Sequence, residues 1–143
     1  MAEQKDDPVG IPDDTRLFRR IDPHQVVYDK DRKERRPTSQ NFNDSKDGSP
    51  MSVFAENVAT EHGETPQDFL RGRWAGWCLA AVRAAAMRQH GQEVYLDPHS
   101  QDPDDRYASH AAVRGRKDTK TRSRLGKDYE WIVPPPNRYE PDN

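Results

Sequence analysis

The chain has 143 residues and a formal net charge of −2, with 31% hydrophobic and 34% charged residues. This length suits one ordinary domain, and the low apolar content excludes a second separate core. No run approaches the roughly 18 apolar residues of a membrane-spanning helix. The acidic start lacks the apolar segment of a secretory signal. A single cysteine, Cys78, excludes an internal disulfide. We therefore expect a protein of a reducing, cytoplasmic compartment.

Hydrophobic residues are concentrated between positions 16 and 133, so the sequence predicts a single domain over residues 16–133. Residues 1–15 are acidic and poor in large apolar side chains, and residues 134–143 are rich in proline. Neither segment carries enough apolar surface to offset the entropy lost when its backbone is ordered. We expect a disordered acidic N-terminal tail and a Pro-rich C-terminal tail.

The first predicted elements are two short strands. "QVVYD" at 25–29 is β-branched and aromatic, a composition typical of a strand. A long polar stretch with Gly and Pro at its end follows, and it is predicted to be mostly loop. "MSVFA" at 51–55 alternates so that Met51, Val53 and Ala55 share one face of a second strand.

Two helical segments are predicted next. Residues 56–63 can form one or two helical turns that end at Gly63. Thr65 then has the features of a helix start, because Pro66 suits the first helical position and Asp68 completes a capping box.

The segment 77–90 is the main apolar element, and its type is ambiguous. Its alanines favour a helix, in which Leu79, Val82 and Ala86 would form an apolar stripe. In the alternative, "WCLAAV" is a strand buried on both faces and a helix begins only near Ala84. We favour the full helix and keep the strand as the alternative.

The last predicted elements are strands at 93–97 ("EVYLD") and 110–115 ("HAAVRG"), then a helix near 119–129 that leads into "WIV". The predicted fold class is α+β. The sheet is expected to be small and mainly antiparallel, with three or four short strands and two or three helices.

Several short segments occur in a recognisable order: "LFRRI", "PTSQNF", "MSVF", a Gly/Trp-rich apolar run, "YLDP" and "ASHAAVRG". This order resembles a type of small bacterial protein of unassigned function, over about residues 16–133. The resemblance implies a bacterial cytosolic origin and one compact unit. It implies nothing about a reaction or a ligand.

The candidate catalytic residues are His110, Ser39, Arg19 and Arg20. A neutral imidazole can act as a general base near physiological pH, and an arginine can bind carboxylate or phosphate with two parallel hydrogen bonds. Together they could form an enzyme site or a phosphate-ligand site. In the alternative interpretation, His110 is a strand-edge residue that is hydrogen-bonded to backbone.

The segment 114–127, "RGRKDTKTRSRLGK", is the strongest electrostatic feature. Cations at this density can displace counterions from nucleic-acid phosphates, although no aromatic residue within the run could stack on a base. A solvated surface is the alternative. The candidate nucleic-acid or partner-binding cations are Arg114, Arg116, Lys117, Lys120, Arg122 and Arg124.

Trp74 and Trp77 complete the candidate binding residues, since Trp is frequent at interface hot spots, although core packing is the alternative. No metal site is expected, because the five histidines form no close ligand pair and the single cysteine cannot build a thiolate site. No cofactor is expected, since no glycine-rich phosphate loop occurs.

Three functional hypotheses follow from these features. The leading one is a non-catalytic accessory subunit that binds a larger protein partner. The first alternative is nucleic-acid binding through 114–127, and the second is a small enzyme or phosphate-ligand-binding protein that uses the Arg/Ser/His set.

Overall fold

A computed structural model describes residues 10–141 of the protein. The strands are β1 (Arg16–Ile21), β2 (Val26–Asp29), β3 (Glu34–Pro37), β4 (Met51–Ala55), β5 (Cys78–Arg83), β6 (Glu93–Leu96), β7 (His110–Arg114) and β8 (Glu130–Val133). The α-helices are α1 (Glu56–Glu61), α2 (Ala84–Gln89) and α3 (Thr119–Leu125). Short 3-10 helices lie at Ser39–Asn41, Pro66–Leu70, Gly72–Trp74 and Pro103–Asp105. Within the described residues, no helix combines the length and apolar character needed to cross a membrane.

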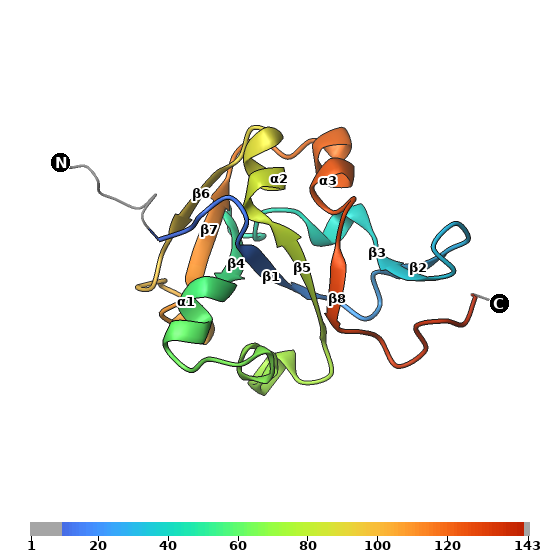
Figure 1. Ribbon diagram of the computed structural model, residues 1–143, viewed down its shortest axis with the longest axis horizontal. Coiled ribbons are helices and arrows are strands. Elements are labelled where there is room, and N and C mark those ends of the chain that lie inside the picture. Colours follow the sequence, from blue (N-terminus) through green and yellow to red (C-terminus); the bar gives the residue numbers. More distant parts are fainter. Residues whose placement is uncertain (1–9, 142–143) are drawn as a thin grey trace.

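The main sheet has six strands in the order β6-β7-β4-β1-β5-β8, and every neighbouring pair is antiparallel. Strands β2 and β3 form a separate hairpin that projects beside β8 (Figure 1). The protein is α+β overall, but the prediction of a small sheet with three or four strands is wrong.

The prediction omitted three strands of the main sheet, β1, β5 and β8. Strand β1 has the sequence RLFRRI and lies in the middle of the sheet, although three of its six residues are arginines. Charged residues are rare in buried strands unless tertiary partners neutralise them. The partners of these arginines are remote in sequence, so the sequence alone argues against a central strand here. Strand β8 is only four residues long and ends directly before Pro134, so its sequence gives a weak periodic signal.

The segment 77–90 follows the strand alternative, and the prediction of one continuous helix is wrong. Cys78–Val82 are all buried within β5, which pairs with β1 on one side and β8 on the other. Helix α2 then begins at Ala84. Burial on both faces of a central strand therefore overrides the helix preference of the alanines.

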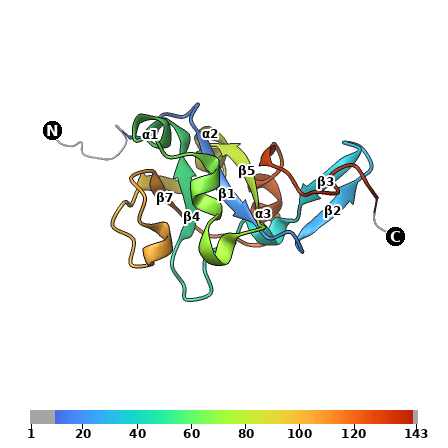
Figure 2. The same cartoon turned by 90° about the horizontal axis from the view of Figure 1, so that it is seen from below.

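The two faces of the sheet carry different side chains. One face presents Leu17 and Val53 with Met87 of α2 and Leu125 of α3, which belong to one buried apolar cluster. The opposite face holds a second cluster, in which Phe18, Phe54 and Leu79 pack against Phe69 and Leu70 of a 3-10 helix. Met51, Val53 and Ala55 lie together in the first cluster, as the alternation predicts, so Ser52 and Phe54 belong to the second face. Figure 2 shows this side of the molecule from below.

Both ends of the described chain contact the body. Ile11 lies in the segment expected to be a tail, yet it is fully buried in the first apolar cluster. The carbonyls of Asp13 and Thr15 accept the first free N–H groups of α2. At the other end, Arg138 donates to the Glu34 carboxylate of β3 over 2.9 Å. Part of the tail prediction falls on residues 1–9 and 142–143, outside the described residues.

Candidate functional site

The candidate site begins with two side chains on adjacent strands. Ser52 lies on β4 and His110 is the first residue of β7, and these strands pair so that Phe54 faces His110 and Ser52 faces Ala112. Ser52 and His110 are therefore diagonal neighbours on the same face of the sheet, a separation that long side chains can bridge. The register of two strands brings a hydroxyl and an imidazole together.

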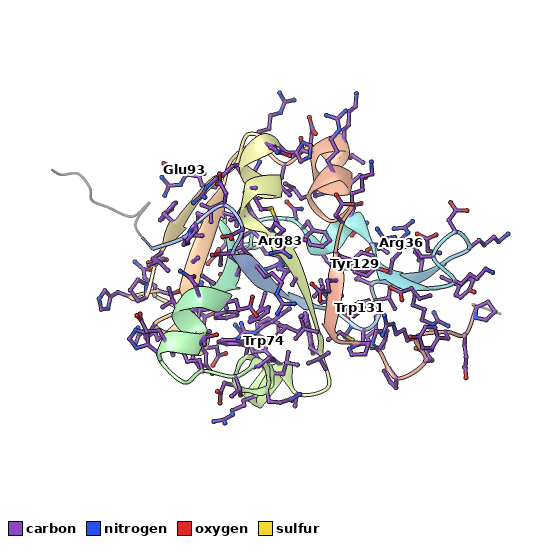
Figure 3. All side chains as sticks on the ribbon, in the orientation of Figure 1. Arg36, Trp74, Arg83, Glu93, Tyr129 and Trp131 are labelled. Atoms are coloured by element: carbon purple, nitrogen blue, oxygen red, sulfur yellow. The ribbon has the colours of Figure 1, made fainter. Side chains whose placement is uncertain are left out.

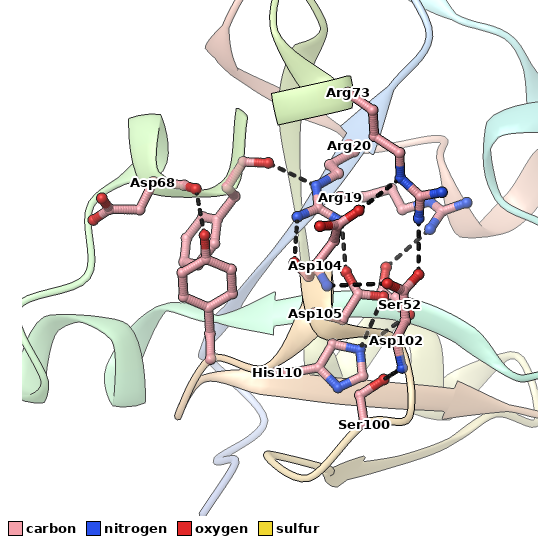
Figure 4. A network of polar contacts seen from close by, with 12 residues as sticks. Arg19, Arg20, Ser52, Asp68, Arg73, Ser100, Asp102, Asp104, Asp105 and His110 are labelled. Atoms are coloured by element: carbon pink, nitrogen blue, oxygen red, sulfur yellow. Dashed lines mark hydrogen bonds and ion pairs between the residues drawn. The ribbon is translucent and has the colours of Figure 1, made fainter. Parts of the chain in front are cut away.

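The imidazole of His110 is fixed through both of its nitrogens, one of which faces Ser52 in Figure 4. Nδ1 lies 2.6 Å from the backbone carbonyl oxygen of Asp97, and Nε2 lies 3.0 Å from the Ser52 hydroxyl oxygen. Because a carbonyl oxygen only accepts, Nδ1 carries a proton, and Nε2 of the neutral ring is an acceptor that faces Ser52. The carboxylates of Asp97 and Asp105 lie 3.8 Å from Nδ1 and 3.9 Å from Nε2.

The hydroxyl of Ser52 has two acceptors for its single proton. One is Nε2 of His110, and the other is Oδ2 of Asp105 at 3.2 Å. With a neutral imidazole the hydroxyl can donate to one acceptor at a time. With an imidazolium, His110 donates to Ser52, and Ser52 donates to Asp105, so every contact is satisfied. These contacts are thus compatible with both the neutral and the protonated imidazole, the two forms between which a general acid–base group alternates.

A buried ion pair holds Asp105 in position. Nη1 of Arg20 lies 2.6 Å from Oδ1 of Asp105, and the side chains are 7% and 10% exposed. Nε of Arg20 donates to the Phe69 carbonyl, and Nη2 donates to the Asp104 carbonyl. Burial lowers the pKa of Arg20, although Asp105 counteracts this by favouring the charged guanidinium. Arg20 is therefore a structural cation with its donors engaged, and it orients the carboxylate that contacts Ser52.

Arg19 differs from Arg20 because its hydrogen bonds reach only carbonyl oxygens. The pairing of β1 with β4 ends at Phe18, so the Ser52 carbonyl of β4 has no partner N–H in β1. Nη1 of Arg19 donates to this carbonyl over 2.9 Å instead. Nε and Nη2 donate to carbonyls at residues 41 and 43 over 2.8 Å and 3.5 Å. Burial, with the neighbouring Arg20 charge, lowers the pKa of Arg19 to about 10. Arg19 is thus a half-buried cation without a bonded carboxylate among the described residues.

A cavity of about 140 Å³ lies next to these groups, and its lining includes Arg19, Arg20, Ser52, Trp74 and Trp77. The indole rings of Trp74 and Trp77 meet edge to face at 4.6 Å, and Arg20 lies over the Trp74 ring at 4.5 Å. Within the part of the chain that the structure describes, the buried Nε1–H of Trp74 has no hydrogen-bond acceptor. The cavity therefore has aromatic walls beside two arginines.

Arg73 closes the outer side of this cavity. Its guanidinium reaches from the 3-10 helix Gly72–Trp74 to Asp102 at 2.8 Å and Asp104 at 2.9 Å (Figure 4). The Arg73 side chain is 58% exposed, so these two ion pairs are solvated and contribute little stability. A second hollow of about 200 Å³ is lined by His110 and shares Ser52 and Asp105 with the first cavity. Ser52 therefore lines both cavities.

The structure brings together some of the predicted site residues and separates others. His110, Arg20 and Asp105 form one network with Ser52, and Arg19 contacts the Ser52 backbone. Trp74 and Trp77, predicted as binding residues, line the same cavity. Ser39 does not belong to this site, since it lines a different groove beside α3.

The sequence analysis missed Ser52 and Asp105. The alternation of "MSVFA" already placed Ser52 on the opposite face from Met51 and Val53, which is the face that a polar group could share with a functional site. Its pairing with His110 depends on strand register, which the sequence does not specify. Asp105 ends the 3-10 helix Pro103–Asp105 in a polar stretch whose sequence gives no sign of burial, and its partner Arg20 is 85 positions away.

The basic segment is less available than its sequence suggests. Lys117 is 1% exposed at its side chain, and its ammonium group donates to the Asp44 carboxylate at 2.6 Å and to two backbone carbonyls. Arg122 donates to the Lys117 carbonyl, and Arg114 lies over the ring of Tyr95. Arg114, Arg116, Lys120 and Arg124 are exposed, and Arg116 has Asp118 3.8 Å away.

No group of three or more His, Cys, Asp or Glu side chains suited to a metal ion occurs among residues 10–141. The lone Cys78 is buried, and burial raises its pKa to about 11. Comparisons with known proteins found no matching family model, no similar curated protein and no similar solved structure. Evidence for function therefore rests on the geometry of the chain itself.

Proposed function

We propose that the protein is a small hydrolase in which Ser52 is the nucleophile and His110 is the general base. The single observation that carries this proposal is the 3.0 Å contact between Ser52 Oγ and His110 Nε2, in a ring whose other nitrogen is fixed by the Asp97 carbonyl at 2.6 Å. A nucleophile, a base within hydrogen-bond reach and a group that orients the base are the parts needed for covalent catalysis.

The proposed reaction is hydrolysis of a carboxylic ester through an acyl-enzyme. Ser52 Oγ attacks the carbonyl carbon while its proton passes to Nε2 of His110. The tetrahedral intermediate collapses, the carbon–oxygen bond to the leaving alcohol breaks, and His110 returns the proton to that alcohol. Water then attacks the acyl group with His110 again as base, which releases the acid and restores the Ser52 hydroxyl.

The carboxylates near His110 support this step. During each proton transfer the ring becomes an imidazolium, and the Asp97 and Asp105 carboxylates lie within 4 Å of its nitrogens. The Asp97 carboxylate lies on the Nδ1 side of the ring, as the carboxylate of a Ser–His–Asp triad does, although the direct hydrogen bond to Nδ1 comes from the Asp97 backbone carbonyl. The Asp105 carboxylate lies on the Nε2 side, where it accepts from the Ser52 hydroxyl.

Arg19 indicates that the substrate carries a negative charge near the scissile ester. Its hydrogen bonds within the described chain use three of the five guanidinium N–H groups, and all three acceptors are neutral carbonyls. An anionic ligand would provide the bonded carboxylate that this half-buried cation lacks. A volume of about 140 Å³ is below the roughly 300–1,000 Å³ of sites for whole ligands. The cavity therefore suits the acyl end of a short acidic ester.

The test compares two p-nitrophenyl esters of equal acyl length, the glutarate monoester and the neutral valerate. The wild type should hydrolyse both, with a lower KM for the glutarate ester, and Ser52→Ala should be inactive. Arg19→Gln should lose the preference for glutarate, while the matched charge loss in the exposed Arg114→Gln should preserve it. If the wild type hydrolyses neither ester faster than Ser52→Ala, the proposal is wrong.

The hypothesis of a non-catalytic accessory subunit stays a prediction, since nothing in the described contacts bears on a partner. Nucleic-acid binding through 114–127 also stays a prediction. Its support is weaker than the sequence suggested, because Lys117 is neutralised by Asp44 and removed from the surface.

A further inference from the structure

A second and larger concave site lies away from Ser52, between the β2–β3 hairpin and α3. It encloses about 620 Å³, a volume within the roughly 300–1,000 Å³ of small-molecule sites. Figure 1 shows the hairpin and α3 on either side of the start of β8, and Figure 3 labels Arg36 and Tyr129 in this region. The lining residues are Val27, Asp29, Asp31, Arg32, Arg36, Pro37, Thr38, Ser39, Phe42, Arg122, Ser123, Gly126, Lys127 and Tyr129. We call this site the hairpin groove.

Cations outnumber acids in the hairpin groove. Four cations and two aspartates line it, and Asp29 is shared between Arg36 at 3.4 Å and Arg32 at 4.0 Å. The side chain of Arg36 is 43% exposed, and Lys127 is exposed at the rim with no carboxylate bonded to it among the described residues. The groove therefore has a net positive charge. Arg32 and Arg36 belong to the wall formed by the hairpin, and Arg122 and Lys127 belong to the wall formed by the end of α3.

Arg122 adds a fourth guanidinium or ammonium charge to the groove. Its Nη1 donates to the Lys117 carbonyl and its Nη2 to the Thr119 hydroxyl, at 2.7 Å and 3.2 Å. Its Nε is buried, so Arg122 acts on a ligand in the groove through its charge.

The floor of the groove is apolar and closely packed. A Cβ at Gly126 would lie 2.2 Å from the Phe42 ring, so α3 approaches this ring as closely as backbone permits. Val27 and Pro37 extend the apolar surface, and the hydroxyls of Thr38, Ser39 and Ser123 border it. An apolar floor beside cations and hydroxyls suits a ligand that has both an apolar or planar body and an anionic group.

We propose that the hairpin groove binds a phosphorylated small molecule of nucleotide size. Arg36 and Lys127 contact the phosphate from opposite walls, the hydroxyls of Ser39 and Ser123 donate to its oxygens, and the ligand body lies against the half-buried Val27. Phosphate is favoured over a carboxylate because donors surround the groove on two sides, and a phosphate offers three acceptor oxygens to them. This proposal is independent of the chemistry at Ser52.

A nucleic-acid strand is the competing occupant, since it presents the same phosphates. The floor argues for the smaller ligand: Phe42 and Tyr129 are 1% and 6% exposed, and Tyr129 is held by a hydrogen bond to Glu34 and by Arg32 above its ring. Single-strand binding uses a series of exposed aromatic faces on which successive bases stack. The two buried rings of the hairpin groove present no such faces.

The experiment titrates the full chain with ribose-labelled fluorescent ADP, GDP, UDP and CDP, with inorganic pyrophosphate as competitor and a labelled oligothymidine strand as a separate probe. At least one nucleoside diphosphate should bind, and pyrophosphate should weaken that binding. The double variant Arg36→Gln/Lys127→Gln should raise Kd at least tenfold. The control Arg114→Gln/Arg116→Gln removes the same charge outside the groove and should leave Kd within twofold.

Each other outcome overturns the proposal. Absence of binding by all four nucleotides up to about 1 mM would show that the groove lacks useful affinity for this ligand class. An equal loss in both double variants would indicate general attraction by net charge. Binding of the oligothymidine strand without any nucleotide binding would assign the groove to nucleic acid. Circular dichroism of each variant would confirm that the fold is retained.

Discussion

Replacement of Asp105 by alanine tests the network that positions Ser52 and His110. Asp105 accepts from Arg20 Nη1 at 2.6 Å through one carboxylate oxygen and from the Ser52 hydroxyl at 3.2 Å through the other. Because the Arg20 side chain is only 7% exposed, water cannot fully replace the lost carboxylate. Arg20 would keep its hydrogen bonds to the Phe69 and Asp104 carbonyls but would have no bonded counter-charge.

The expected loss of stability is large for a single substitution. Removal of one partner of a buried ion pair costs about 3–5 kcal/mol, because the other charge stays buried without compensation. The total stability of a domain of this size is about 5–15 kcal/mol, so the variant should be close to its folding limit. With an m-value of about 2 kcal/mol/M in urea, a loss of about 4 kcal/mol lowers the midpoint by about 2 M.

The assay is urea unfolding followed by tryptophan fluorescence, to which Trp74 contributes from its position against Arg20. The double variant Arg20→Met/Asp105→Leu is the informative control, because removal of both charges should recover much of the loss. A midpoint for Asp105→Ala within about 0.5 M of the wild type would refute the argument. A double variant that is less stable than Asp105→Ala would refute it as well.

Three further predictions concern residues away from this ion pair. Gly126→Ala should lower stability by about 1–3 kcal/mol in urea unfolding, since its Cβ would overlap the Phe42 ring, and an unchanged midpoint would contradict the close contact. Lys117→Met should destabilise the fold, because its ammonium group bonds Asp44 and two buried carbonyls, yet it should leave the salt dependence of any DNA retardation unchanged. Burial raises the pKa of Cys78 from 9.0 to about 11, so the thiol ionises at a lower pH in the unfolded chain than in the folded protein. Between pH 9 and 11 the free energy of unfolding should therefore fall by about 2 kcal/mol more in the wild type than in Cys78→Ala. Parallel pH profiles of the wild type and Cys78→Ala would rule out the raised pKa of Cys78.

The elements that the sequence predicts well are those whose pattern is local. "MSVFA" and "HAAVRG" are strands near the expected bounds, and Met51 and Val53 share a buried face as their alternation predicts. The capping feature at Thr65 is also local, and the Asp68 carboxylate accepts from the Thr65 N–H at 2.7 Å. Such signals depend on neighbours within a few residues.

The elements that sequence reasoning missed depend on remote partners. Strand β1 contains Arg19 and Arg20, whose charges argue against a central strand until the carbonyls and the carboxylate that receive them are known. Alanines in β5 favour a helix, and burial between two neighbouring strands reverses that preference.

The sequence predicted only some residues of the candidate site, because their contacts also depend on partners that are remote in sequence. His110 and both arginines were identified by their chemistry, but the serine was placed at Ser39, which lies in the hairpin groove. Ser52 belongs with His110 because β4 and β7 are neighbours in a particular register. A shift of that register by one residue would turn Ser52 to the other face of the sheet.

The most direct test of the proposed chemistry is the rate at which a fluorophosphonate labels the protein, with the modified residue located by peptide mass spectrometry. Fluorophosphonates react with serines activated by a base, so the outcome does not depend on the natural substrate. We predict one label on Ser52, a rate about 100-fold lower in His110→Ala, and an unchanged rate in Ser39→Ala. Absence of labelling, or a rate on Ser52 that does not depend on His110, would contradict the account.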